Sequence, residues 1–431
     1  MPSRGAEAEA IFRTVADAAL EADRRLAVDD QDLAVSRPAK ASAMDRADYN
    51  VAVGYLRAFA RFLVFALHAS MAYYKDRLPL SRADLQFSAP VIDHAKFAGS
   101  RILIGFNEIT LMSLMFFLSG LFLWPSLTKK GAGHFLRDRV GRLALPFLAS
   151  GGLVAALAYY PAYLQASGPG AGIAGYVHTW LTMNHWLTGP AWFLLLLFIY
   201  DLGAAALYAV WPDWGERVAA LAKDAAERPL RFCLIVIAIS GAVYMPLALG
   251  FGAYDWWHFG FLWVQKSRAL HYAAYFFLGA GAGAYGLRRG LVARDGKLAR
   301  NWRWWGLAGL VAFAVGGNLI LYTVNKRLEA TLLWGGLADL AWVICCAVLA
   351  FALIAIFVRF ARRGPILDSF ASNSYGMYLC HYVFVTWTQY ALLGSHMAPA
   401  LKALCTLIVA VSLSWLLVAQ LRRIPIVART I

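Results

Sequence analysis

Long uninterrupted apolar runs, separated by short polar segments, dominate the chain. Ten of these runs are long enough to cross about 30 Å of hydrocarbon as helices. They lie near residues 54–74, 107–127, 143–164, 190–211, 231–251, 269–287, 303–323, 334–358, 373–393 and 399–420. The apolar positions come in continuous runs rather than alternating at period two, which indicates helices and disfavours a β-barrel. The pattern therefore predicts an all-α, polytopic membrane protein with about ten transmembrane helices.

Composition excludes several other classes of protein. Of the 431 residues, 61% are hydrophobic and only 15% are charged, against about 25% charged in an ordinary soluble domain. This rules out a soluble globular enzyme, a disordered chain and a disulfide-rich secreted scaffold. The five cysteines all fall in apolar runs and none forms a CxxC pair, so we expect neither a disulfide framework nor a metal site.

The first 50 residues differ from the rest, because they are polar and alanine-rich and contain no apolar core of a signal peptide. We interpret 1–50 as a cytosolic extension that is either mobile or a helix on the membrane surface. Residues 51–425 would then form the membrane domain.

The net charge of +15 is explained by topology. If the N-terminus is inside, the inner loops and C-terminal tail hold 21 Lys and Arg, and the outer loops hold 10. By the positive-inside rule both termini face the cytosol, in a cytoplasmic (inner) membrane. The basic residues thus give no independent support for a nucleic-acid partner.

The first predicted span carries polar groups that lipid tolerates poorly. Arg57 and His68 are eleven residues apart, which on a helix means an angular offset of about 20° and a rise of about 16 Å. Arg61 lies about 40° from Arg57. One face thus carries two guanidinium groups near the cytosolic edge and an imidazole near mid-membrane. Snorkelling arginines and an interhelical histidine hydrogen bond are the structural alternatives.

A basic segment follows the second span, with Lys129, Lys130, Arg137, Arg139 and Arg142. Arg139 and Arg142 are three residues apart, so they share a face of the entering third helix. Paired guanidinium groups at a membrane entrance suit phosphate, which they bind bidentately. An ordinary positive-inside loop is the alternative.

Other candidates are weaker one by one. Glu108, Asp201 and His381 are titratable groups within or beside apolar runs, and one of the two carboxylates could orient His68 by accepting its second ring N–H. Ser119 with Gly120 permits close helix packing. Trp256, Trp257 and His258 form an aromatic cluster on the outer side. This cluster is either an interfacial belt or a platform on which sugar rings stack.

No nucleotide-binding or common hydrolase motif appears in a suitable context. Instead, an ordered set of short motifs resembles the acyltransferase 3 family of membrane O-acyltransferases. The set comprises Arg57-x10-His68, FFLSG at 116–120, the basic segment leading to Arg139 and Arg142 with Pro146, AWFL at 191–194, and SYGMYLCH at 374–381. The segment RALHYAAYFFLGAGAGAYG and the terminal RRIPIVA look most like the glucan-modifying, succinyl-transferring branch.

The resemblance implies transfer of an acyl group from cytosolic acyl-CoA to an extracytoplasmic carbohydrate hydroxyl, with acyl-CoA as donor substrate and no other cofactor. It assigns His68 to catalysis and Arg57, Arg139 and Arg142 to acyl-CoA. The glucan-modifying branch often begins its second helix with a histidine, whereas this chain has NEITLMSLMFFLSG with Glu108. This departure leaves open the acceptor and the acyl group.

A transporter or flippase for an anionic lipid or sugar is the alternative, since it would also place polar residues at mid-membrane. Such proteins often contain inverted repeats. No internal repeat is evident between residues 54–251 and 269–420, which favours the acyltransferase.

Overall fold

The computed structural model describes residues 40–74, 89–168, 170, 172–183, 186–288, 290–329 and 331–430. Two compact units divide the chain, Met1–Asp48 and Tyr49–Ile431, and the second unit holds everything discussed below. The predicted extension at 1–50 lies mostly outside the described residues. Only the helical backbone of residues 40–50 is described there.

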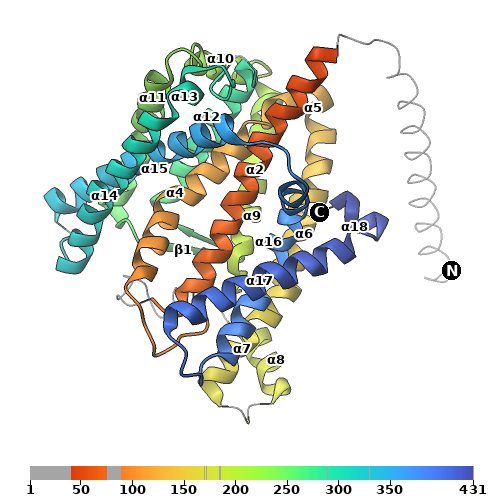
Figure 1. The fold of residues 1–431 in the computed structure, drawn as a ribbon, viewed down its shortest axis with the longest axis vertical. Coiled ribbons are helices and arrows are strands. Elements are labelled where there is room, and N and C mark those ends of the chain that lie inside the picture. The colour runs from red at the N-terminus through yellow and green to blue at the C-terminus, as the bar shows by residue number, and fades with distance from the viewer. Residues whose placement is uncertain are drawn as a thin grey trace, which may run out of the picture. The chain divides into compact units, whose positions relative to one another are not determined.

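Helices make up most of the described chain (Figure 1). In chain order they are α2 (Lys40–Met71), α4 (Gly99–Gly120), α5 (Leu123–Arg139), α6 (Leu145–Leu148), α7 (Ala155–Ser167), α8 (Ile173–Thr182), α9 (Trp192–Val210), α10 (Trp214–Ala219), α11 (Pro229–Phe251), α12 (Arg268–Tyr285), α13 (Lys297–Arg300), α14 (Trp302–Lys326), α15 (Leu332–Phe360), α16 (Pro365–Ala391), α17 (Pro399–Leu421) and α18 (Pro425–Thr430).

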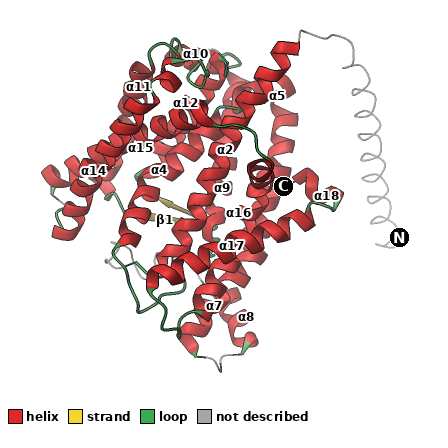
Figure 2. Ribbon diagram, in the orientation of Figure 1, coloured by secondary structure: helices red, strands yellow, loops and turns green. Residues whose placement is uncertain are grey.

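One small β element departs from the all-α prediction (Figure 2). Strands β1 (Trp256–Phe259) and β2 (Leu262–Gln265) form an antiparallel hairpin in which Trp256 pairs with Gln265. The hairpin lies in the predicted outer loop between the fifth and sixth spans, so it leaves the transmembrane scheme unchanged.

The polytopic helical prediction is confirmed. Within the described residues, eight helical segments are long and apolar enough to cross a membrane, namely Val51–Met71, Gly99–Gly120, Leu123–Ser167, Gly189–Val210, Pro229–Phe251, Trp302–Lys326, Leu332–Phe360 and Pro399–Leu421. The other two predicted spans coincide with α12 and α16, which are helical but less apolar. The buried polar residues of α16, among them Asn373, His381 and Gln389, explain its lower apolarity.

Two predicted boundaries were wrong. Helix α4 begins at Gly99 rather than near 107, so Glu108 lies about two and a half turns inside it rather than at its outer start. The segment predicted as a loop at 128–142 is helical, with a break at Gly131, whose φ of 72° only glycine adopts readily. Two π-helical stretches, Val140–Ala144 and Ala149–Val154, flank Pro146 where a bend was predicted.

Helices α4 and α12 approach so closely at two of their glycines that no side chain would fit there. A methyl group at Gly120 would lie 2.0 Å from the carbonyl oxygen of Phe276, and one at Gly279 would lie 2.2 Å from that of Phe117. The packing predicted for the Ser-Gly pair is thus confirmed at Gly120. Ser119 instead donates a hydrogen bond to the carbonyl of Met115 at 2.8 Å.

Candidate functional site

Two cavities of about 460 and 510 Å³ lie among the helices of the second unit. We call the first the histidine cavity, because His68 lines it, and the second the arginine cavity, because it is lined by Arg57, Arg61, Arg139 and Arg142. Phe193 and Tyr378 line both cavities. The two spaces therefore meet at these two side chains.

The arginine cavity gathers residues that are far apart in the sequence. Besides its four arginines it is lined by Ser119, Lys130, Asp138, Asp201, Tyr375 and residues of the C-terminal helix α18, among others. Five basic side chains thus face two acidic ones, so the cavity favours an anion.

Each of the two α2 arginines that line the cavity is held by a specific contact. Arg57 donates from Nη2 to the carbonyl of Leu118 at 2.6 Å, and its guanidinium lies 4.4 Å from the ring centre of Phe122. Arg61 donates from Nη1 to Ser374 Oγ at 2.8 Å. These contacts fix the guanidinium groups at the cavity wall instead of letting them snorkel away from the protein.

The second pair of arginines enters from the segment around the π-helical turn. Arg139 Nε lies 3.2 Å from Asp201 Oδ2, and the Asp201 side chain is only 1% exposed. The backbone carbonyl of Arg142 accepts a hydrogen bond from the Tyr375 hydroxyl. Both arginines line the arginine cavity, and Asp201, the ion-pair partner of Arg139, comes from α9.

His68 lies in the last turn of α2, closer to the end of its helix than the predicted mid-membrane position. Its ring centre is 4.8 Å from that of Tyr382 and 5.6 Å from that of His381. Gln389 Nε2 donates to the carbonyls of His68 and Ala69 at 2.8 and 3.3 Å. Since the last carbonyls of a helix lack intrahelical partners, Gln389 anchors the turn that carries the imidazole.

His381 is fully buried against the His68 ring. Its Nδ1 lies 2.7 Å from the carbonyl of Tyr378. A carbonyl can only accept, so Nδ1 carries the proton and Nε2 is left as an acceptor in the neutral ring. Within the described residues Nε2 has no hydrogen-bond partner.

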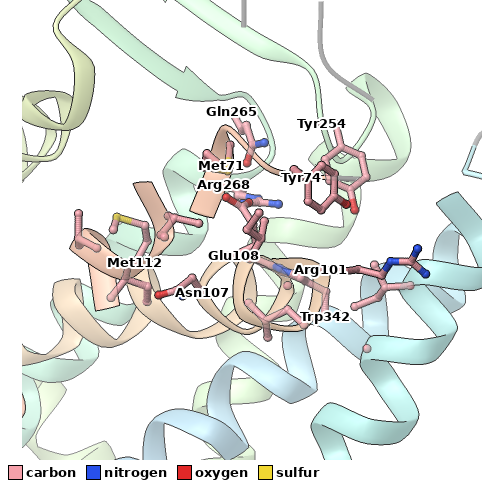
Figure 3. Close-up of a pocket in the computed structure, with 18 of the residues that line it drawn as sticks. Met71, Tyr74, Arg101, Asn107, Glu108, Met112, Tyr254, Gln265, Arg268 and Trp342 are labelled. Atoms are coloured by element: carbon pink, nitrogen blue, oxygen red, sulfur yellow. The ribbon is translucent and has the colours of Figure 1, made fainter. Parts of the chain in front are cut away.

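Glu108 lines the histidine cavity together with His68 and pairs there with an arginine. Its Oε2 lies 2.9 Å from Arg268 Nη1 (Figure 3). Asp201 likewise forms an ion pair with Arg139, in the arginine cavity. Each carboxylate therefore has an arginine partner, and the role of either one in orienting the imidazole stays a prediction.

The predicted aromatic cluster divides between the two faces of the hairpin, as the period-two alternation of a strand requires. Trp256 lines the histidine cavity. Trp257 is 56% exposed, and His258 packs on Trp263 with ring centres 4.0 Å apart. Only Trp256 of the three is thus placed where a ligand of this cavity could contact it.

Sequence reasoning missed Tyr378, at the junction of the two cavities, and Arg268, in the lining of the histidine cavity. Tyr378 lies within the SYGMYLCH motif, where its position three residues before His381 was a usable signal. Its hydroxyl donates to the carbonyl of Pro190. Arg268 lies at the start of a predicted span, where a basic residue usually marks the membrane interface. In the structure its side chain is only 6% exposed.

A metal centre finds no support within the described residues, where no group of three or more His, Cys, Asp or Glu side chains could hold an ion. All five cysteines are free thiols.

Comparison with known families adds a decisive finding. Residues 50–419 match the sequence model of an acyltransferase domain, that of the acyltransferase 3 family. No curated protein and no solved structure matches the chain.

Proposed function

The chain belongs to the acyltransferase 3 family, is therefore a membrane-bound acyltransferase, and on that premise we propose that it moves an acyl group from cytosolic acyl-CoA to a hydroxyl of an extracytoplasmic carbohydrate. The family assignment favours this enzyme over a transporter. The observation that carries the proposal is the meeting of the arginine and histidine cavities at Phe193 and Tyr378.

The arginine cavity suits the CoA head group. CoA carries a 3′-phosphate and a pyrophosphate, and guanidinium groups bind phosphate oxygens bidentately. Arg57, Arg139 and Arg142 are the proposed phosphate ligands, and Arg61 lines the same wall. The excess of basic over acidic side chains in the cavity would attract the anion, while Asp201 holds Arg139 in place.

The thioester would then reach His68 through the junction. Arg57 and His68 are separated by about 16 Å along α2, and an extended pantetheine arm bridges a separation of this order. With the CoA head in the arginine cavity, the reactive carbonyl lies between the His68 imidazole on one side and Phe193 and Tyr378 on the other. The rings of Phe193 and Tyr378, with centres 6.4 Å apart, would exclude water from the thioester.

His68 is the proposed general base. A neutral imidazole takes the proton of the acceptor hydroxyl while that oxygen attacks the thioester carbonyl. The tetrahedral intermediate expels the CoA thiolate, which recovers the proton from the imidazolium. A transient acyl-His68 intermediate is a variant of this route. His381 and Gln389 would position the ring rather than react.

The proposed orientation follows from the same division. The arginine cavity includes Lys130 and residues from the basic segment predicted to face the cytosol, whereas the hairpin with Trp256 belongs to a predicted outer loop. Both termini would face the cytosol, in the cytoplasmic membrane. Trp256 would contribute to acceptor binding, whereas Trp257 and His258 lie outside the lining of the histidine cavity.

The test is release of CoA by the purified full-length protein in proteoliposomes, with acetyl-CoA and succinyl-CoA as donors and an oligosaccharide as acceptor. We expect acceptor-dependent CoA release that His68→Ala abolishes. His178→Ala is the matched control, because His178 is an exposed histidine on α8 outside both cavities. Equal release from wild type and His68→Ala would refute the assignment of His68.

A further inference from the structure

The histidine cavity has two chemically different ends. The wall formed by α4 and α14 is mostly apolar: its lining includes Ile104, Met112, Phe313, Ile320 and Leu321, and the amides of Asn107 and Asn318 interrupt it. Burying such a wall against a hydrocarbon chain lowers the free energy of binding, whereas burying it against sugar hydroxyls does not.

This apolar wall reaches the surface of the molecule. Ile102 lines the cavity and is also 66% exposed, within a helix long and apolar enough to span a membrane. Helix α14 lies at the edge of the molecule beside α4 and α15 (Figure 1). On its outward face Leu310 and Val315 are 66% and 67% exposed. Surface of this kind on a membrane span is covered by lipid chains.

The other end of the cavity is polar. Arg268 and Glu108 form their ion pair there, and Gln265 and Tyr254 lie on the same side of the cavity (Figure 3). A hydrocarbon chain alone would desolvate these groups without offering them a hydrogen bond. A purely polar sugar would leave the apolar wall uncovered. An amphiphile satisfies both ends.

We infer that the acceptor is a lipid-anchored carbohydrate, whose hydroxylated head is held between His68 and the Arg268–Glu108 pair and whose hydrocarbon chain lies along the α4–α14 wall. This inference rests on the proposed acyl transfer, and it adds the physical class of the acceptor. It also gives the acceptor a route into the cavity from the bilayer, past Ile102.

The experiment compares acceptors that share a head group and differ in their chain. Maltose, methyl maltoside and hexadecyl maltoside are offered to the full-length protein in proteoliposomes with acetyl-CoA or succinyl-CoA, and acylated maltoside is measured by mass spectrometry. The key variant is Gly317→Leu, because Gly317 lines the cavity and a Cβ there meets only the Phe313 ring at 3.6 Å. Gly306→Leu is the matched control on the same helix, where a Cβ meets nothing within 4 Å.

We expect acylation of hexadecyl maltoside to exceed that of maltose. Gly317→Leu should raise the KM for hexadecyl maltoside roughly tenfold, as displacement of about two methylene groups predicts, while Gly306→Leu changes nothing. Equal acylation of all three acceptors, or an unchanged KM in Gly317→Leu, overturns the inference and leaves the proposed function intact. The same holds if Gly317→Leu alters only the preference for the donor's acyl-chain length, because the wall would then hold the donor.

A binding readout separates this inference from the proposed function. A hexadecyl maltoside with a diazirine in its chain is photo-crosslinked to the protein without any acyl-CoA. Labelled peptides from α4 and α14 that hexadecyl maltoside competes away, and that Gly317→Leu loses, support the site even if no acyl transfer occurs. Labelling elsewhere, or labelling unaffected by Gly317→Leu, refutes it.

Discussion

Removing Arg139 and removing the charge of Asp201 both break the Arg139–Asp201 ion pair, but they should lower the stability of the protein by very different amounts. The Asp201 side chain is 1% exposed and the Arg139 side chain 23%, with Nε and Oδ2 3.2 Å apart. Arg139→Ala strands a carboxylate inside the protein, which costs about 3–5 kcal/mol of stability. Asp201→Asn strands a guanidinium that borders a cavity of about 510 Å³ and lies 4.7 Å from the Phe135 ring centre. Water can hydrate that guanidinium, so we expect a loss of only about 1 kcal/mol.

The double variant makes this prediction specific. Arg139→Ala combined with Asp201→Asn removes both charges and should recover most of the stability that Arg139→Ala alone loses, a coupling of about 2–3 kcal/mol. Acyl-CoA affinity should behave differently. Both variants that lack Arg139 lose a charge-assisted bond to phosphate worth about 1.5–3 kcal/mol, and bind acyl-CoA roughly ten- to a hundredfold more weakly. Asp201→Asn alone keeps the guanidinium and should bind acyl-CoA at least as tightly as wild type.

The assay measures the free energy of unfolding of the four proteins in detergent micelles, followed by tryptophan fluorescence, and their acyl-CoA affinity by titration. Two results would refute the reasoning. Equal destabilisation by the two single substitutions would mean that burial of Asp201 does not set the cost. Recovery of acyl-CoA affinity in the double variant would mean that Arg139 acts on stability alone.

Four further predictions concern other parts of the molecule. His68→Ala should abolish turnover while acyl-CoA affinity stays nearly intact, and normal turnover in the folded variant would remove His68 from the mechanism. Arg142→Lys keeps the positive charge but loses the bidentate geometry of the guanidinium group, so the apparent KM for acyl-CoA should rise roughly tenfold. An unchanged KM would mean that Arg142 serves only to set the membrane topology. A cysteine at Lys130 should react with an impermeant thiol reagent only from the cytosolic side, and labelling from outside would reverse the proposed topology. Gly120→Ala should lower thermal stability, because its Cβ would lie 2.0 Å from the Phe276 carbonyl oxygen; a variant as stable as wild type would show that α4 and α12 can separate without cost.

Much of the helical framework was predictable, because hydrocarbon imposes a length and a composition on every segment that crosses it. Each of the ten predicted spans coincides with helix in the structure. Boundaries were less predictable. Ser100 and Arg101 made the start of α4 look like loop, yet the Ser100 hydroxyl donates to the Phe97 carbonyl and the helix begins there.

The polar face of the first spanning helix was also predictable from the sequence, since helical geometry alone sets the spacing of Arg57, Arg61 and His68. The partners of these residues were not. Ser374 reaches Arg61 and Gln389 reaches the His68 carbonyl from α16, more than 300 residues away. Such contacts depend on which helices pack together, and a single sequence does not determine that.

The sequence by itself thus determined a polytopic helical protein, its basic segment and the polar face of α2, because each depends on local composition and periodicity. Only the tertiary structure decided that the arginines and His68 line two cavities meeting at Phe193 and Tyr378, and that Glu108 pairs with Arg268. The physical reason is that a buried charge takes the counter-charge that helix packing brings within a few ångströms, and sequence distance says nothing about that choice.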